Sequence, residues 1–405
     1  MTLTPDRIAE TNFPPSRQAA LDRLAGFAPR AGRVYDIGRN TDLGPDQPGA
    51  VSRLSPYTSR RLITEQEIVE AVLALHRLDA AEKYVQEVLW RTYWKGWLEL
   101  RPSVWTRFLE TRDRSLIDLA DSRAVADAER GATGIEGFDD WACELVQTGY
   151  LHNHARMWFA SIWIFTLGLP WALGADFFLR HLVDADAASN TLSWRWVAGL
   201  QTPGKTYLAT ASNIERYTEG RFAPKGLAQT AVALTEPPVG PALPLAPRQR
   251  TDLCQPFLLL VTPDDLHPES LLPVRSAIQG VVVAADPDLA WGEAGRRFTD
   301  AAAGDTATRA ARHFGGPVNR VDRLAASDLA TAAGDAGVSR IVTAFAPVGP
   351  TAQALARLAP ELALAGITLV QVRRDWDDAF WPLATKGFFA FKDRIPAVLG
   401  ELGVS

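Results

Sequence analysis

Four residues at the head of an apolar run carry groups that could bind a ligand or take part in chemistry. They are His152, Asn153, His154 and Arg156, and the apolar run behind them covers residues 157–165. Two imidazoles, an amide and a guanidinium can donate and accept hydrogen bonds and carry charge. The apolar run is too short to span a bilayer and predicts a buried helix. The four polar groups are therefore expected at the edge of a buried site.

A second group of polar residues follows about thirty positions later. Asp184 and Asp186 open a predicted helix on which Asp186, Asn190 and Trp194 stand four residues apart. This spacing places a carboxylate, an amide and an indole on one helix face. Unpaired polar groups are costly to bury, so an ordinary core helix would not carry them beside Trp. The pattern predicts that a partner satisfies them.

Two other interpretations of these residues are open. His152-x-His154 and Asp184-x-Asp186 could ligate the metal of a hydrolase. Such pairs are common by chance, however, and Trp-rich surroundings do not suit a hydrolytic metal site. In the second interpretation the aspartates are helix caps and the histidines are satisfied surface groups. That interpretation leaves the amide and the guanidinium of the same stretch unexplained.

Composition limits the possible classes of protein. The 405 residues allow two domains, and 47% hydrophobic and 22% charged residues are typical of globular proteins. With a formal net charge of −5, any nucleic-acid binding must use a local positive patch. Two cysteines exclude a disulfide framework and a four-cysteine metal or iron–sulfur site, and they fit a reducing cytoplasm. The N-terminus has no apolar segment typical of a signal peptide.

The positions that must hold these groups are predicted to be helical. A possible cap at Ser16 and a capping box from Thr64 to Glu67 mark two helix starts, and residues 39–50 read as a loop. Periodicity predicts helices over residues 13–24, 65–78, 80–100, 105–121 and 138–148. The sequence therefore predicts an all-α domain over residues 1–235.

One predicted helix carries a concentration of indoles and charges. Glu87, Trp90, Arg91 and Trp94 fall on one face of the helix over residues 80–100. Taken alone, this face predicts buried indoles and an intrahelical Glu87–Arg91 ion pair. Thirteen tryptophans, ten of them before residue 200, indicate an aromatic core, an electron-transfer relay or a base-stacking surface.

A polar segment precedes the capping box. Ser52, Arg53 and Ser55 offer hydroxyls, backbone N–H groups and a guanidinium close to a helix start. Such a combination suits an anion such as a pyrophosphate. A polar turn between helices is the alternative, and these residues alone favour it.

The character of the chain changes after residue 235. Residues 236–250 are Pro-rich and predict an extended linker. Beyond it, short apolar runs at 256–261, 280–285, 340–345 and 368–372 alternate with Ala-rich helical stretches at 325–336 and 351–364. This alternation predicts a doubly wound parallel α/β (Rossmann-like) domain over residues 251–405. No GxGxxG follows a strand, so a dinucleotide site of its own is not expected.

The stretch from Gly149 to Trp196 resembles the flavin-binding helical domain of the photolyase/cryptochrome family. The family pattern runs Gly-aromatic-x-His-Asn-x-x-Arg-Met, then Asp-x-Asp-x-x-x-Asn, then Trp-x-Trp. The matching residues are Gly149, Tyr150, His152, Asn153, Arg156, Met157, Asp184, Asp186, Asn190, Trp194 and Trp196. The resemblance covers about residues 13–225 and implies that FAD is the missing partner.

In this family the α/β domain comes first. Here the order is reversed, which implies a circular permutation. Residues 262–271 resemble a weakened form of the family's first strand-to-helix segment, with Thr262 and Pro263 in place of paired arginines. Residues 385–396 resemble the segment that closes that domain.

The resemblance implies a set of cofactor-binding residues. Val51 departs from the Thr usual in the phosphate-binding segment, and Arg156 with Asp184 would form an ion pair beside the flavin ring. Asn190 would face the flavin N5, where an amide offers no ready proton and suits an anionic reduced flavin. The implied FAD-binding residues are Tyr35, Ser52, Arg53, Leu54, Ser55, Tyr84, Glu87, Arg91, Asn153, Arg156, Asp184, Asp186 and Asn190.

The resemblance also implies a photochemical reaction. Excited reduced FAD would donate an electron to a pyrimidine dimer flipped out of DNA, the dimer would split, and the electron would return. Glu87 would hydrogen-bond the dimer, with Trp90, Trp196 and Met157 on the lesion side. Trp194 and Trp171 would begin the Trp chain that reduces the flavin in light, with Trp105 or another indole as a substitute for the missing third member.

The pair His152-Asn153 resembles the cyclobutane-dimer branch of the family. The resemblance therefore implies a protein that binds DNA containing such dimers. It is expected to be a monomer in the cytoplasm and not to associate with a membrane. A cryptochrome-like photoreceptor with the same FAD and no repair is the alternative. The negative net charge of the chain favours that alternative. So does His154, which stands where many repair enzymes have Arg.

Overall fold

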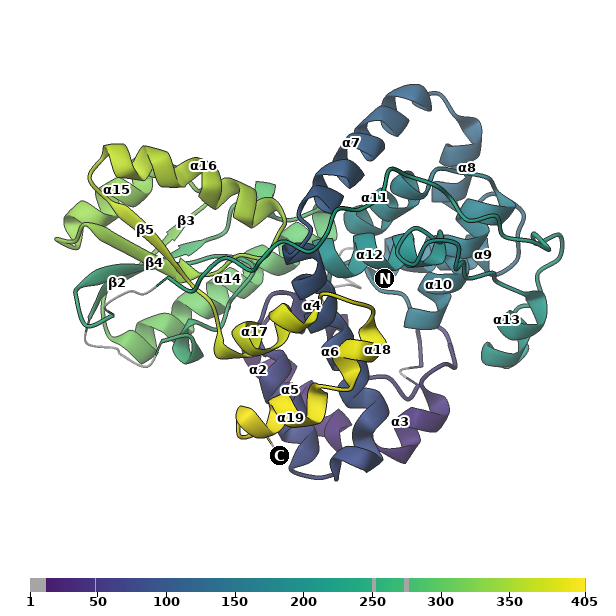
Figure 1. The fold of residues 1–405 in the computed structure, drawn as a ribbon, viewed down its shortest axis with the longest axis horizontal. Coiled ribbons are helices and arrows are strands. Elements are labelled where there is room, and N and C mark those ends of the chain that lie inside the picture. The colour runs from purple at the N-terminus through teal and green to yellow at the C-terminus, as the bar shows by residue number, and fades with distance from the viewer. Residues whose placement is uncertain (1–11, 48, 250–252, 273–276, 405) are drawn as a thin grey trace, which may run out of the picture.

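The computed structural model describes residues 12–47, 49–249, 253–272 and 277–404. Its first part is helical, and its second part holds a parallel sheet between helices (Figure 1). None of the helices within these ranges combines the length and apolarity that crossing a membrane requires. The helices of the first part are α2 (Arg17–Phe27), α3 (Arg33–Gly38), α4 (Ser55–Ser59), α5 (Glu65–Leu73), α6 (Leu78–Glu99), α7 (Ser103–Asp118), α8 (Arg123–Arg130), α9 (Phe138–Thr148), α10 (Asn153–Ser161), α11 (Trp171–His181), α12 (Ala187–Val197) and α13 (Ala211–Tyr217).

Capping residues set several of these helix ends. The Ser16 side chain accepts a hydrogen bond from the Ala19 N–H, and Thr64 and Glu67 form the predicted capping box at the start of α5. Gly149 ends α9 in the left-handed region, with φ of 68°. The apolar run after α10 forms a π-helical turn, Ile162–Thr166. Such turns are rare and often lie at functional sites.

The second part contains a five-stranded sheet in the order β3-β2-β1-β4-β5, with all neighbours parallel. Four strands occupy the predicted apolar runs, which confirms the α/β fold class. The fifth, β3, was not predicted because Asn319 and Arg320 at its centre are exposed. The elements are β1 (Phe257–Val261), β2 (Ile278–Ala284), α14 (Gly292–Phe314), β3 (Val318–Val321), α15 (Ala326–Asp335), β4 (Arg340–Ala344), α16 (Pro350–Leu364) and β5 (Thr368–Val372).

The two faces of the sheet bury different sets of side chains. Along β1, Leu258 and Leu260 join the core beneath α15 and α16, whereas Phe257, Leu259 and Val261 face the α14 side. The core on the α14 side continues without a break into the helical part. Helix α14 also packs on α11, so the sheet is held directly against the helices that carry the candidate site (Figure 1).

The chain returns to the helical part at its end. Helices α17 (Asp375–Phe380), α18 (Phe388–Lys392) and α19 (Ile395–Glu401) follow the sheet, and α17 and α18 pack on α6 (Figure 1, yellow). A Cβ on Gly96 of α6 would lie 2.8 Å from the Cα of Trp381, so only glycine allows this approach. The Tyr93 hydroxyl donates to the Lys386 carbonyl at 2.8 Å.

Residues 236–249 contain no helix or strand and run along both parts of the molecule (Figure 1). At one end, Glu236 pairs with Arg195 of α12. Near the other end, the Ala246 carbonyl accepts from Arg373, which follows β5. The segment is thus bound to both parts along its length. The domain boundaries at residues 235 and 251 stay predictions.

Candidate functional site

The predicted ion pair between α10 and the turn before α12 is present. The Arg156 guanidinium lies 3.2 and 3.4 Å from the Asp184 carboxylate, and its Nε donates to the Leu151 carbonyl. Asp184 is buried, which would raise its pKa, but Arg156, Arg91 and the Ser55 hydroxyl lower that pKa below its ordinary value. The carboxylate is therefore ionised at neutral pH.

Asp186 has two roles in the structure. It caps α12 by accepting a hydrogen bond from the Ser189 N–H at 2.7 Å. It also lies 3.1 Å from Arg91 and 3.6 Å from Lys95, both on α6. Burial would raise its pKa, yet Lys95, Arg91 and the Ser189 N–H lower it to about 2. Asp186 thus joins α6 to α12 as a carboxylate.

These contacts correct one prediction. The polar groups of this stretch were expected to need an external partner, but the chain supplies cations for both aspartates. Asn190 also has a partner, because its amide donates to the Ala175 carbonyl of α11 at 2.8 Å. The pair of Arg156 with Asp184 was predicted, but the pair of Arg91 with Asp186 was not, since Arg91 lies on α6, far from Asp186 along the chain. The case for a cofactor must come from other observations.

Asn190 and Trp194 share one face of α12, as predicted, and the structure shows that this face packs on α11. The Trp194 ring lies against Gly174 of α11, where a Cβ would clash with it. Its indole N–H is buried without an acceptor among the described residues. Trp194 makes ring contacts with Phe159, Trp163 and Phe178. This packing fixes the indole tightly.

Trp171, at the start of α11, belongs to a different aromatic series. In the described structure no ring contact joins it to Trp194. Its centroid is 5.6 Å from Phe108, which is 5.4 Å from Trp105. Trp105 in turn lies edge-on to Trp291 at 6.0 Å. An aromatic path thus runs from Trp171 through Trp105 to the loop before α14.

Helix α6 presents two more of the predicted residues. Glu87 pairs with Arg39 at 2.5 Å, whereas Arg91 pairs with Asp186. The prediction of an intrahelical ion pair between Glu87 and Arg91 is therefore wrong. One turn earlier, Tyr84 meets Tyr35 edge-to-face at 5.0 Å, which brings α3 to the same surface of α6.

The predicted phosphate-binding segment forms a concave turn of backbone. Arg53 has φ of 53°, in the left-handed region, and Leu54 follows with φ of −88° and ψ of −7°. Adjacent left- and right-handed residues point successive N–H groups into one concavity, which binds anions. Within the described ranges, the N–H groups of Arg53, Leu54 and Ser55 have no protein acceptor. Arg53 also lies over the Tyr150 ring, 4.6 Å from its centroid.

The residues expected on the lesion side do not form one cluster of rings. Trp90 stacks on Phe388 of α18 at 3.6 Å with an interplanar angle of 12°, so Phe388 covers one face of its ring. Trp196 stacks on Tyr207 at 5.7 Å. Met157 is half-buried, and Asn153 is exposed at the start of α10. A substrate could use only the other face of Trp90.

The metal-hydrolase interpretation fits the structure poorly. Both aspartates are engaged by cations, and His154 contacts the Asn40 carbonyl at 2.9 Å and stacks on Trp158. His152 caps α10 by accepting from the His154 N–H. Burial lowers the pKa of His152 to about 4. In the described part of the chain, no three acidic, His or Cys residues are grouped to hold a metal.

Three cations of the site region were missed from sequence. Arg39, Arg60 and Lys95 each lie at or beside the predicted residues. Lys95 could have been found, because it stands one helical turn after Arg91. Arg60 and Arg39 are brought in only by tertiary packing.

Comparison with known proteins identifies the helical part. The family described as "FAD binding domain of DNA photolyase" matches residues 84–223. The deoxyribodipyrimidine photo-lyases of Streptomyces griseus and Agrobacterium fabrum are 35% and 32% identical to 42% and 46% of this chain. The chain covers 35% and 38% of their lengths, which is well under half. A class III photolyase structure from Agrobacterium tumefaciens is 26% identical, with 53% of this chain and 45% of that chain covered and a TM-score of 0.44.

The matched segment contains α10, α11, α12 and most of α6, which are the helices of the candidate site. Over residues 84–223 the helical part thus resembles the FAD-binding domain of the DNA photolyases, and FAD is the cofactor that this match supports. The residues present fit that cofactor at the turn of Arg53 and Leu54, where unpaired N–H groups suit a pyrophosphate.

Proposed function

We propose that this protein is a light-driven, FAD-dependent photolyase that repairs cyclobutane pyrimidine dimers. The observation that carries the proposal is the meeting of three elements. Arg156–Asp184 and Arg91–Asp186 tie α10 and α6 to the start of α12, and the Ser55 hydroxyl brings the anion-binding turn to the same aspartate. A reversed order of the family's two domains is part of this proposal.

FAD, when bound, would supply light absorption and the transferable electron. The chain's own residues would hold and orient the two reactants. The turn of Arg53 and Leu54 would bind the pyrophosphate, and the two aspartates would orient the flavin ring. Glu87, which is about one-third exposed, would present its carboxyl group to the substrate. Positioning of this kind, rather than acid–base chemistry, is the contribution expected of the protein.

A repair assay tests this function. The purified protein should show the absorption bands of a flavin and release FAD on denaturation. Illumination with blue light should then restore normal bases in DNA that carries cyclobutane dimers. Glu87→Gln should lower the repair rate while FAD stays bound, whereas Glu110→Gln on the exposed face of α7 should not. Absence of repair in the FAD-loaded protein would contradict the proposal.

A photoreceptor without repair is the second candidate, and the Trp90–Phe388 stack favours it. This stack covers one face of an indole that a repair enzyme would use, and α18 is held there by Lys392 paired with Glu82 at 3.3 Å. If Phe388 excludes the lesion, Phe388→Ala should bind dimer-containing DNA more tightly than the unaltered protein. Equal or weaker binding would contradict that role for Phe388.

A further inference from the structure

A tyrosine and a histidine lie side by side at the edge of the candidate site. The Nε2 atom of His154 lies 3.3 Å from the Tyr207 hydroxyl, and its Nδ1 atom lies 2.9 Å from the Asn40 carbonyl oxygen. A carbonyl oxygen can only accept a hydrogen bond, so Nδ1 carries the proton of the neutral ring. Nε2 is then an acceptor, and the phenolic O–H of Tyr207 donates to it.

The position of Tyr207 is fixed from two sides. Its N–H donates to the Val197 carbonyl at the end of α12, at 3.2 Å. Two residues later, the Ala209 N–H donates to the Ser161 hydroxyl of α10 at 2.8 Å. The Tyr207 ring also stacks on Trp196 of α12, with centroids 5.7 Å apart and an interplanar angle of 28°. The phenol is therefore attached to both helices that carry the predicted flavin residues.

The imidazole is also held in place, and it is neutral. It stacks on the buried ring of Trp158 at 4.2 Å, and the Trp158 N–H donates to the Asn213 side chain at 2.9 Å. Burial lowers the pKa of His154 below its ordinary value, although the Asn40 carbonyl and Asp42 oppose this effect. At neutral pH the ring can therefore accept a proton.

A phenol beside a neutral base is suited to oxidation by one electron. The cation radical of a phenol is a strong acid, so oxidation becomes favourable when the proton leaves with the electron. Tyr207 can give its electron to the stacked ring of Trp196 once that indole has been oxidised, and its proton to Nε2 of His154. Trp196 is then restored, and a neutral tyrosyl radical and an imidazolium remain.

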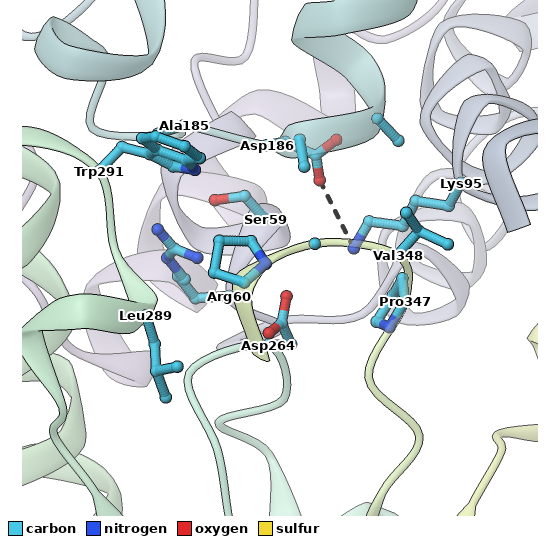
Figure 2. A pocket seen from close by; sticks show the side chains of 14 residues that line it. Ser59, Arg60, Lys95, Ala185, Asp186, Asp264, Leu289, Trp291, Pro347 and Val348 are labelled. Atoms are coloured by element: carbon cyan, nitrogen blue, oxygen red, sulfur yellow. Dashed lines mark ion pairs between the residues drawn. The ribbon is translucent and has the colours of Figure 1, made fainter. Parts of the chain in front are cut away.

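The aromatic series that begins at Trp171 ends differently. Its last ring, Trp291, lines a pocket between the sheet and the helical part (Figure 2). The Trp291 N–H is buried without an acceptor among the described residues, and the Arg112 guanidinium lies 5.4 Å from the ring centroid. An oxidised indole there would keep its proton and its charge next to another cation. The pair of Tyr207 and His154 avoids both costs.

We propose that Tyr207 is a terminal electron donor in the light-driven reduction of the flavin, with His154 as the acceptor of its proton. The electron passes to a Trp196 that has lost its own electron to the flavin in light. An external thiol then donates a hydrogen atom to the tyrosyl radical, and the imidazolium releases its proton to water. The inference rests on the bound FAD of the proposed function and does not require DNA repair.

Electron paramagnetic resonance tests this role. The FAD-loaded protein is illuminated without DNA, frozen and measured. The expected signal is a tyrosyl radical whose hyperfine pattern changes in protein labelled with deuterated tyrosine. Tyr207→Phe should abolish this signal and slow flavin reduction several-fold in the presence of thiol. A tyrosyl signal that survives in Tyr207→Phe, or flavin reduction without any tyrosyl signal in the unaltered protein, would overturn the proposal.

The matched control for Tyr207 is a second tyrosine beside the same histidine. The Tyr217 ring lies 5.1 Å from the His154 ring, but its hydroxyl makes no hydrogen bond in the described structure. Tyr217→Phe should therefore keep the radical, and its loss there would contradict the assignment to Tyr207. Absence of repair in a protein that forms the radical would contradict the proposed function alone.

His154 is tested separately, in light and in the dark. His154→Phe keeps a ring against Trp158 but removes the proton acceptor, so it should lower the radical yield by about tenfold or more. In the dark, an NMR titration should give His154 a higher pKa in Tyr207→Phe than in the unaltered protein, because the phenolic O–H stabilises the neutral imidazole. An unchanged pKa of His154 would show that the hydroxyl does not donate to Nε2 and would overturn the proposal.

Discussion

One nitrogen of the Arg61 guanidinium donates to both carboxylate oxygens of Asp377, at 2.7 and 2.8 Å, across 316 positions of sequence. Both residues are almost fully buried, and Arg61 adopts a left-handed φ of 48°. Glu65 and Asp265 complete the cluster, at 3.7 and 3.5 Å from the same guanidinium. The beginning of the helical part is thereby joined to the end of the chain.

Removing one member of this cluster should destabilise the whole protein. Asp377→Ala leaves Arg61 with fewer acceptors in a buried position, and we expect a loss of about 3–5 kcal/mol in the free energy of unfolding. Urea denaturation measures this loss. The control is Asp375→Ala, which breaks an exposed pair with Arg248 and should cost no more than about 1 kcal/mol. Similar losses for the two variants would contradict the role assigned to the cluster.

Asn190→Asp should change which reduced flavin species accumulates under light. A carboxylate cannot donate to the Ala175 carbonyl, and we also expect a stability loss of about 1–3 kcal/mol. Illumination of the FAD-loaded protein, followed by absorption spectra, checks the first outcome. Asn213→Asp is the matched control, because Asn213 uses its oxygen to accept from Trp158 and an aspartate keeps that acceptor. Identical photoreduction spectra for Asn190→Asp and the unaltered protein would place Asn190 away from the flavin N5.

Trp105→Phe should slow light-driven reduction of the flavin several-fold. Trp105 is the indole that the Phe108 ring connects to Trp171, and it is the candidate for the missing third member of the relay. The rate of flavin bleaching under constant light measures the effect. Trp381→Phe is the control, since that indole N–H has no acceptor in the described residues and its ring contacts Phe345 instead. Equal rates for both variants would remove Trp105 from the relay.

Stability should fall as the pH drops from about 6.5 to about 4. Burial lowers the pKa of His152 to about 4 in the folded protein, whereas the unfolded chain has the ordinary value near 6.5. Between these values the unfolded state binds more protons, so acid favours unfolding. The full effect of His152 is about 3 kcal/mol. His152→Asn should flatten the dependence of unfolding free energy on pH, and an unchanged slope would contradict this assignment.

The local parts of the fold followed from sequence because local rules determine them. The Thr64–Glu67 capping box and the buried runs of β1, β2, β4 and β5 depend on neighbouring residues. Strand β3 was not predicted, because half of its residues face solvent and carry polar side chains. Helix α14 was not predicted either; its many small and charged residues give a weak apolar periodicity.

The candidate site was predictable only in part, for the same reason. The intervals among Arg156, Asp184 and Asp186 indicated the resemblance to the photolyase FAD-binding domain and the first ion pair. Arg39, the partner of Glu87, and Lys95, a partner of Asp186, lie far from those carboxylates along the chain, so no rule of spacing pairs them. The stack of Phe388 on Trp90 joins residues almost three hundred positions apart. Contacts of this kind depend on the finished tertiary structure.

The return of the last helices to α6 has a consequence for biosynthesis. Domains generally fold as units while the ribosome extends the chain. In this protein the helical part is synthesised before the sheet, yet Arg61 and Trp90 need Asp377 and Phe388 as partners. The helical part therefore cannot complete its packing until residues 377–388 have been made. Truncation before residue 377 would deprive the Arg61 guanidinium of its main acceptor and uncover one face of the Trp90 indole.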